Sequence, residues 1–167
     1  MNGRQQAGTL IGAVVLAGVL GWMFTAPYLG NTGLARTPGV ILGGTPTPAL
    51  DDFTPLNASS PGPLLMKQSG FPPFVNYLSW VGTSDGVITA THPDGALWAQ
   101  RVRDRGGDGW LRIGEAVYAM EAIEILGDER IDMMEQWAAK VGITLDDSLY
   151  EGSAPLRDFE VFFWQPR

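Results

Sequence analysis

The hydrophobic and polar positions divide the chain into three stretches with different patterns. No charged residue occurs between Gln5 and Ala35, and residues 7–29 within that interval read AGTLIGAVVLAGVLGWMFTAPYL. Residues 30–73 show no sustained helical or strand period, whereas residues 74–167 contain short apolar runs separated by turn signals. The pattern therefore predicts an N-terminal anchor helix at 1–29, a linker at 30–73 and a small folded domain at 74–167.

The first stretch is long enough to cross a membrane as a single helix. About 20 apolar residues span the roughly 30 Å hydrocarbon core, and a helix pairs its backbone groups internally. Pro27 and Gly30 are expected to end the helix. The alternative is a cleaved signal peptide with Arg4 before its apolar region. Cleavage after Ala26 fits poorly, because Phe24 is too bulky for the position three residues before the cut.

The charges that flank the helix predict its orientation. Arg4 and the α-amino group precede it, and Arg36 follows it, so the slight bias favours an N-terminus in the cytoplasm. The domain would then lie in the periplasm, anchored in the inner membrane of a Gram-negative cell. Small residues four apart let a neighbouring helix approach closely in lipid. They predict a helix-packing face at Ala13, Ala17 and Gly21.

The linker is rich in residues that favour extended chain. Residues 30–73 contain 7 glycines, 8 prolines and four charged residues. Such a composition predicts a semi-rigid, extended spacer. The stretch also contains apolar side chains that disordered segments usually lack. Phe53, Phe71 and the adjoining Phe74 are therefore candidate contacts with a partner protein along whose surface the linker would lie.

The third stretch predicts a small α+β domain. A β-hairpin is expected from Val87–Thr91 and Ala96–Val102, joined by a turn at His92–Gly95, and Trp110–Ile113 is a short third strand. A helix pair should follow. Its first member, Glu115–Leu126, consists of helix formers, although a strand is the alternative. Its second begins at Asp128 as N-cap and ends at Gly142. Its apolar stripe comprises Ile131, Met134, Trp137 and Val141.

A final strand is predicted at Asp158–Trp164. Phe159, Val161 and Phe163 form one face, and Phe162 and Trp164 form the other, so both faces are apolar. Either the strand is central and buried, or one face docks on a partner, since aromatic residues are enriched at interface hot spots. Phe162 and Trp164 are therefore further candidate partner contacts.

Charge and composition exclude several functions. Residues 74–167 carry 8 basic and 16 acidic residues, a net charge of −8, which disfavours nucleic-acid binding. The absence of cysteine excludes disulfides and thiolate catalysis. The lone histidine, His92, lies in a predicted turn, and residues 103–109 (RDRGGDG) lack the alternating oxygen ligands of a calcium loop. We therefore expect no catalytic site, metal or cofactor.

These observations favour a non-catalytic, single-pass accessory subunit of a large bacterial membrane complex. The helix would pack among other subunits, and the acidic domain would brace the outer face of the complex. By analogy, photosynthetic and respiratory assemblies are candidates. An acidic domain could also attract a basic soluble electron-transfer protein. The alternatives are a free membrane-tethered periplasmic binding module and, less favoured, an anchored enzyme that uses carboxylates alone.

Overall fold

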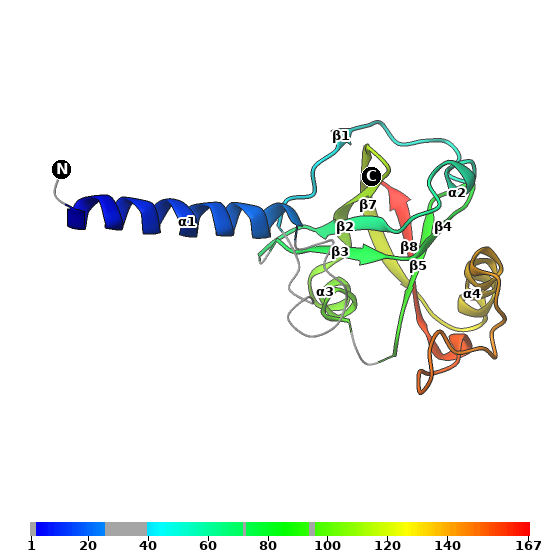
Figure 1. Ribbon diagram of the computed structural model, residues 1–167. Helices are drawn as coiled ribbons and strands as arrows, with labels where there is room; N and C mark the ends of the chain where they lie inside the picture. Colours follow the sequence, from blue (N-terminus) through cyan, green and yellow to red (C-terminus); the bar gives the residue numbers. More distant parts are fainter. Residues whose placement is uncertain (1–2, 26–39, 72, 94–95) are drawn as a thin grey trace.

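The computed structural model describes residues 3–25, 40–71, 73–93 and 96–167. Helix α1, Gly3–Thr25, stands apart from a sheet-rich domain (Figure 1). Its segment Gln6–Met23 has a mean hydropathy of 1.6, is 0% buried, and is long and apolar enough to cross a membrane. The predicted apolar helix is therefore present. Pro27, which was expected to end it, lies outside the described residues.

Eight strands form one sheet in the order β3-β2-β6-β7-β8-β5-β4, with β1 paired beside β7. The strands are β1 (Thr45–Pro46), β2 (Leu64–Gln68), β3 (Val75–Leu78), β4 (Trp80–Gly82), β5 (Val87–Thr91), β6 (Asp108–Ile113), β7 (Ala116–Ile125) and β8 (Glu160–Pro166). All pairs except β1–β7 are antiparallel.

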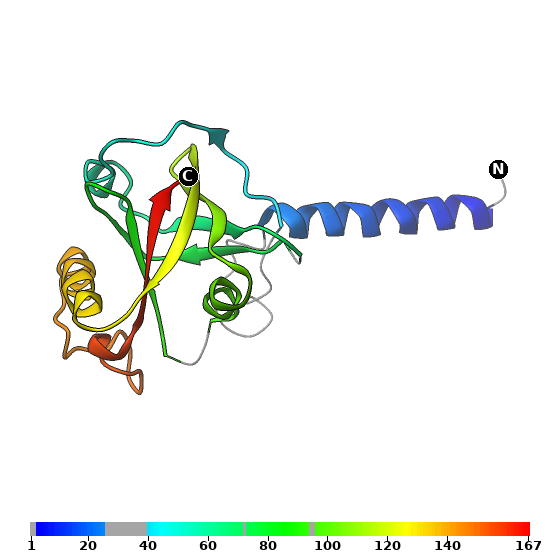
Figure 2. The ribbon, with the colours of Figure 1, turned by 180° about the vertical axis from the view of Figure 1, so that it is seen from behind.

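The sheet curls into a nearly closed barrel because two segments are shared between its halves. The edge strands β3 and β4 are separated only by Ser79, so one bent segment forms both edges (Figures 1 and 2). Strand β7 pairs with β6 through Ala116–Glu121 and with β8 through Met120–Ile125. Near its start, β1 pairs with β7 in parallel. Because β6 pairs with the first half of β7 and β8 with the second half, β7 is shared between the two halves of the sheet.

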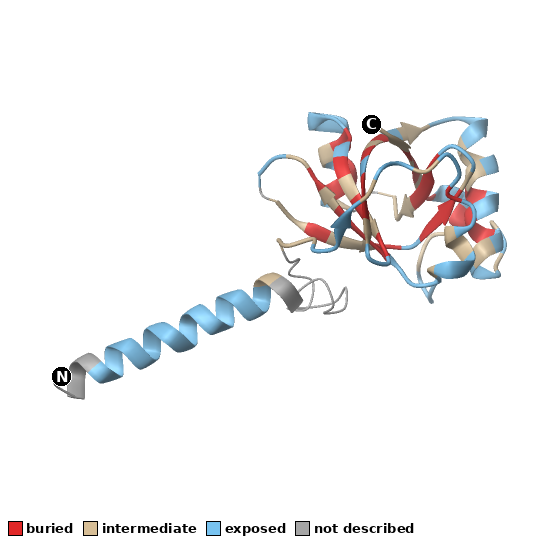
Figure 3. Cartoon of the chain, turned by 90° about the horizontal axis from the view of Figure 1, so that it is seen from above, coloured by how far each residue is buried: buried red, intermediate tan, exposed pale blue. Residues whose placement is uncertain are grey.

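Two hydrophobic clusters stabilise the domain. The first draws on the strands of the barrel and on α3 (Leu97–Arg105), and the second lies where α4 (Asp128–Val141) packs on β4, β5 and β8. Strand β8 contributes to both clusters, because successive side chains of a strand point to opposite faces. Phe162 and Trp164 belong to the first cluster and Val161 to the second. Figure 3 shows the buried residues concentrated inside the domain, whereas α1 is exposed.

The final strand and the last helix are present, although β8 begins at Glu160 rather than at Asp158, which belongs to a short 3-10 helix. Strand β8 lies between β7 and β5, so the central, buried alternative holds. Helix α4 follows Gly127, which occupies the N-cap position in place of Asp128, and it ends at Gly142 with a φ of 77°. Acidic residues in its first turn stabilise the helix, because they lie at the positive end of its dipole. Of the predicted stripe, Met134 and Trp137 are buried, whereas Val141 is 44% exposed.

The predicted hairpin is wrong. Strand β5 pairs with β4 and β8, and the run assigned to the second hairpin strand forms α3 instead. Trp98, Ala99 and Val102 are buried, and their spacing fits one side of a helix that packs on the barrel. Residues 94–95 of the predicted turn lie outside the described residues.

The helix predicted at Glu115–Leu126 is also wrong, because this segment is β7. Pairing with a neighbour along most of its length outweighs the helix propensity of its alanine, glutamate and methionine residues. Its buried side chains include Tyr118, Met120 and Ala122 at the even positions. On the opposite face, Val117 is also buried and Ile125 packs against the second cluster, whereas Ile123 is 43% exposed.

The described part of the predicted linker, from Val40, belongs to the folded domain rather than to a free spacer. Strand β2 pairs with β3 and β6 inside the sheet. Phe53, Leu64 and Met66 are each 0% exposed. A short helix, α2 (Leu56–Ser59), also forms in this stretch. The apolar residues that set this segment apart from a disordered tail therefore fill the core of their own domain.

Candidate functional site

The predicted helix-packing face is exposed along α1. Ala13, Ala17 and Gly21 are all solvent-accessible, and so are Gly8 and Gly12, which lie on a different side of the helix. A side chain added at Gly21 would meet nothing within 4 Å. The described domain does not cover this surface, so a second helix has room to approach it closely.

The predicted partner contacts fall into two groups. Phe53, Phe162 and Trp164 are fully buried in the first cluster, and their packing accounts for their apolar character without a partner. The indole of Trp164 donates to the hydroxyl of Thr89 at 2.9 Å. In contrast, Phe71 is 82% exposed. Phe74 is half-buried. Of these five aromatic residues, Phe71 is the one that is largely exposed.

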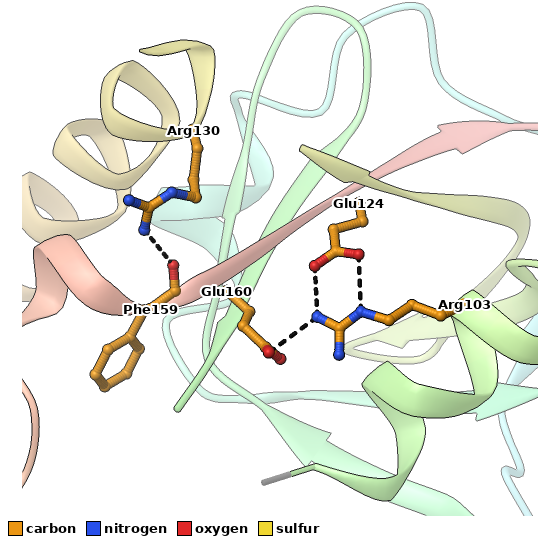
Figure 4. Close-up of polar contacts among 5 residues, drawn as sticks. All are labelled: Arg103, Glu124, Arg130, Phe159 and Glu160. Atoms are coloured by element: carbon orange, nitrogen blue, oxygen red, sulfur yellow. Dashed lines mark hydrogen bonds and ion pairs between the residues drawn. The ribbon is translucent and has the colours of Figure 1, made fainter. Parts of the chain in front are cut away.

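A charged cluster that sequence reasoning missed joins α3 to β7 and β8 (Figure 4). The Arg103 guanidinium donates from Nε to Glu124 at 2.8 Å and from a terminal nitrogen to the same carboxylate. It also contacts Glu160 at 2.9 Å. The two carboxylates raise the pKa of Arg103 above its ordinary value, chiefly through the hydrogen bond to Glu124.

This cluster is a structural clamp. An arginine that is more firmly protonated than usual cannot act as an acid or base near neutral pH. Its guanidinium also lies 5.6 Å from the centre of the Phe162 ring, and thus braces the first cluster. No sequence spacing could have predicted the cluster, because its members come from three elements and the assignments of two were wrong.

Two further cations are satisfied by backbone carbonyls. Arg130 of α4 donates to the carbonyl of Phe159 at 2.6 Å (Figure 4). It also donates to the carbonyl of Arg157 at 2.6 Å. Lys140 donates to the carbonyl of Trp80 at 2.7 Å and lies 3.6 Å from the centre of its ring. Burial lowers the pKa of Lys140. Both residues fix α4 against the sheet.

The lone histidine lies in an aromatic setting. The His92 ring is 4.5 Å from that of Phe159 and 5.5 Å from that of Tyr150, measured between centres. Its Nε2 atom is buried and has no hydrogen-bond partner among the described residues. Catalysis by this residue would need a nucleophile or substrate group at that nitrogen, and its described neighbours supply aromatic rings.

The described residues contain no group of three or more metal-ligating side chains. A pocket of about 250 Å³ is lined by Ser59, Ser60, Gly62, Pro63, Ile113 and Gly114, and it contains no titratable group. Residues 103–109 do not form a single loop, since they divide between α3 and β6. No protein-family model matches the chain, and no curated protein is significantly similar to it.

Proposed function

We propose that this chain is a single-pass, non-catalytic accessory subunit of a larger bacterial membrane complex, bound to its partners chiefly through α1. The observation that supports the proposal is the apolar and fully exposed surface of α1, with small residues at four-residue spacing. Helices in lipid associate by close packing of such residues, because hydrophobicity alone gives no driving force there.

The proposed topology places the N-terminus in the cytoplasm and the domain in the periplasm, with α1 in the inner membrane. The domain would brace the outer face of a photosynthetic or respiratory assembly. Half of the sixteen acidic residues in 74–167 lie in one segment. Residues 128–158, which comprise α4 and the segment that follows it, carry eight acidic and three basic residues, a net charge of −5. Such a surface would favour encounter with a basic soluble electron-transfer protein.

Purification from the membranes of the encoding organism in mild detergent tests the proposal. Co-migration of the chain with a large complex is the expected result, and a monomeric product would overturn it. Ala13→Leu, Ala17→Leu and Gly21→Leu together should release the chain from the complex by blocking close approach of helices. The control is Val15→Leu with Val19→Leu, which adds bulk elsewhere on α1 and should leave the association unchanged.

A second candidate is a free, membrane-tethered binding module. It is favoured by the burial of Phe53, Phe162 and Trp164, because a domain that covers these aromatic residues itself does not need a partner to do so. The same purification separates the candidates. A module would run as a monomer in detergent, and the substitutions in α1 would leave its behaviour unchanged.

A further inference from the structure

One end of the domain presents exposed apolar side chains. Phe71, in the turn between β2 and β3, is 82% exposed, and Leu97, the first residue of α3, is 71% exposed. Single exposed apolar residues are common on soluble proteins, so exposure alone does not define a surface. The contacts, charges and chain connections around these two residues give further information.

Two hydrogen bonds hold the β2–β3 turn against α3. Arg101 donates to the carbonyl of Ser69 at 3.1 Å, and Arg105 donates to the carbonyl of Phe71 at 2.8 Å. Arg101 and Arg105 follow Leu97 by four and eight residues, so all three lie along one side of α3. The β2–β3 turn and the exposed side of α3 thus form one surface, called here the turn–α3 surface.

The turn–α3 surface is basic in an otherwise acidic domain. Residues 64–78 and 97–105 together carry four basic residues and one acidic residue. Arg103 among them is paired with Glu124 and Glu160, so the surface together with these two carboxylates has a net charge of +1. The one acidic residue is Asp104, which is exposed on α3. Helix α4 and its acidic surroundings lie on another side of the domain (Figures 1 and 2). An anionic surface would attract the first end and repel the second.

The chain that leads from α1 reaches the domain at this same end. The described part of the domain starts at Val40, whose carbonyl accepts a hydrogen bond from Lys67 at 2.9 Å. Lys67 lies in β2, two residues before Ser69 in the turn. Residues 26–39 connect Val40 to the end of α1. Fourteen residues reach at most about 50 Å when fully extended, so this end of the domain stays within that distance of a membrane that holds α1.

We propose that the turn–α3 surface docks on the bilayer in which α1 is anchored. Phe71 enters the boundary between headgroups and acyl chains, and Arg101 and Arg105 approach the lipid phosphates. Exposed phenylalanine side chains flanked by basic residues bury themselves at that boundary, and guanidinium groups bind phosphate oxygens through paired hydrogen bonds. The domain then lies against the membrane with its acidic α4 side directed away from it. This inference rests on the proposed membrane anchor.

Full-length protein in lipid vesicles provides the test. The chain contains no cysteine, so Ser69→Cys places a fluorophore at one position beside the turn. Ser84→Cys, in the turn between β4 and β5, is the control at the other end of the bent β3–β4 segment. Spin-labelled lipids should quench the probe at position 69 several-fold more than the probe at position 84. The difference should increase when phosphatidylglycerol is added to phosphatidylcholine.

Substitutions in the surface sharpen the test. Phe71→Ser and Arg105→Gln should each reduce quenching at position 69 towards the level at position 84. Leu126→Ser is the matched control, because Leu126 is 72% exposed but lies directly before α4. It should leave quenching unchanged. Tryptophan fluorescence of each variant verifies that the domain is folded.

Three results would contradict the docking. Equal quenching at positions 69 and 84, with the chain inserted in the vesicles, would overturn the docking and leave the anchor intact. If the probe at position 69 were shielded from solvent as strongly in lipid-free detergent as in vesicles, a protein contact would explain the shielding instead. A chain that does not co-float with the vesicles would overturn the anchor, and the docking with it.

Discussion

Phe53→Ala tests directly whether the segment before β2 belongs to the folded domain. Phe53 is 0% exposed, its ring packs edge-on against Tyr118 with 5.3 Å between centres, and its backbone N–H donates to Thr83 at 2.9 Å. Truncating a buried phenylalanine costs about 3–5 kcal/mol of unfolding free energy. With a urea dependence of about 2 kcal/mol per molar, the unfolding midpoint should fall by roughly 2 M.

The assay is urea unfolding of the full chain in detergent, followed by tryptophan fluorescence. The matched control is Phe71→Ala, which removes the same atoms from a side chain that is 82% exposed. Its unfolding free energy should change by no more than about 0.5 kcal/mol. If both substitutions had equally small effects, Phe53 would lie in a free linker and the described packing would be refuted.

Three further predictions concern a close backbone contact in the sheet, the ion pair of Arg103 with Glu124, and the pKa of Asp147. Gly107→Ala should lower the unfolding free energy by about 1–3 kcal/mol, because an added Cβ would lie 1.9 Å from a carbonyl oxygen of β7, whereas Gly62→Ala, in open space, should not. A double-mutant cycle of Arg103→Ala and Glu124→Ala should give a coupling of about 1 kcal/mol, and additive effects would contradict the clamp. Hydrogen bonds from the threonine three residues earlier lower the pKa of Asp147. The ionised carboxylate therefore stabilises the fold above the ordinary carboxyl pKa of 3.8, and this stabilisation is lost as the pH falls through the lowered pKa. Asp147→Asn should therefore lower the urea midpoint at neutral pH, with a difference that disappears on acidification, and a difference independent of pH would contradict this assignment.

The elements that could be predicted are those whose pattern is local. Helix α1 follows from an uncharged apolar run, and α4 from an apolar stripe that ends at a glycine, Gly142. Strand β8 follows from an aromatic run with two apolar faces, and its burial on both sides agrees with its central place in the sheet. In each case, the residues that define the element lie in one continuous stretch of sequence.

The errors occur where distant pairing decides the local structure. Residues 116–125 contain good helix formers, but pairing with β6 and β8 makes them a strand. Residues 64–68 were predicted to lie in the extended linker, but pairing with β3 and β6 makes them a strand of the sheet. The clamp around Arg103 could not be predicted for the same reason, since Glu124 is 21 residues away. Sequence spacing does not encode such contacts.

The anchor and its orientation are the centre of this account, and cysteine accessibility tests them most directly. Asn2→Cys and Ser84→Cys each place one thiol in a chain that has none. In spheroplasts of a Gram-negative host, a membrane-impermeant maleimide should label position 84 at once and position 2 only after the membrane is permeabilised. Labelling of both positions before permeabilisation, or recovery of the chain in the soluble fraction, would contradict a single membrane crossing by α1.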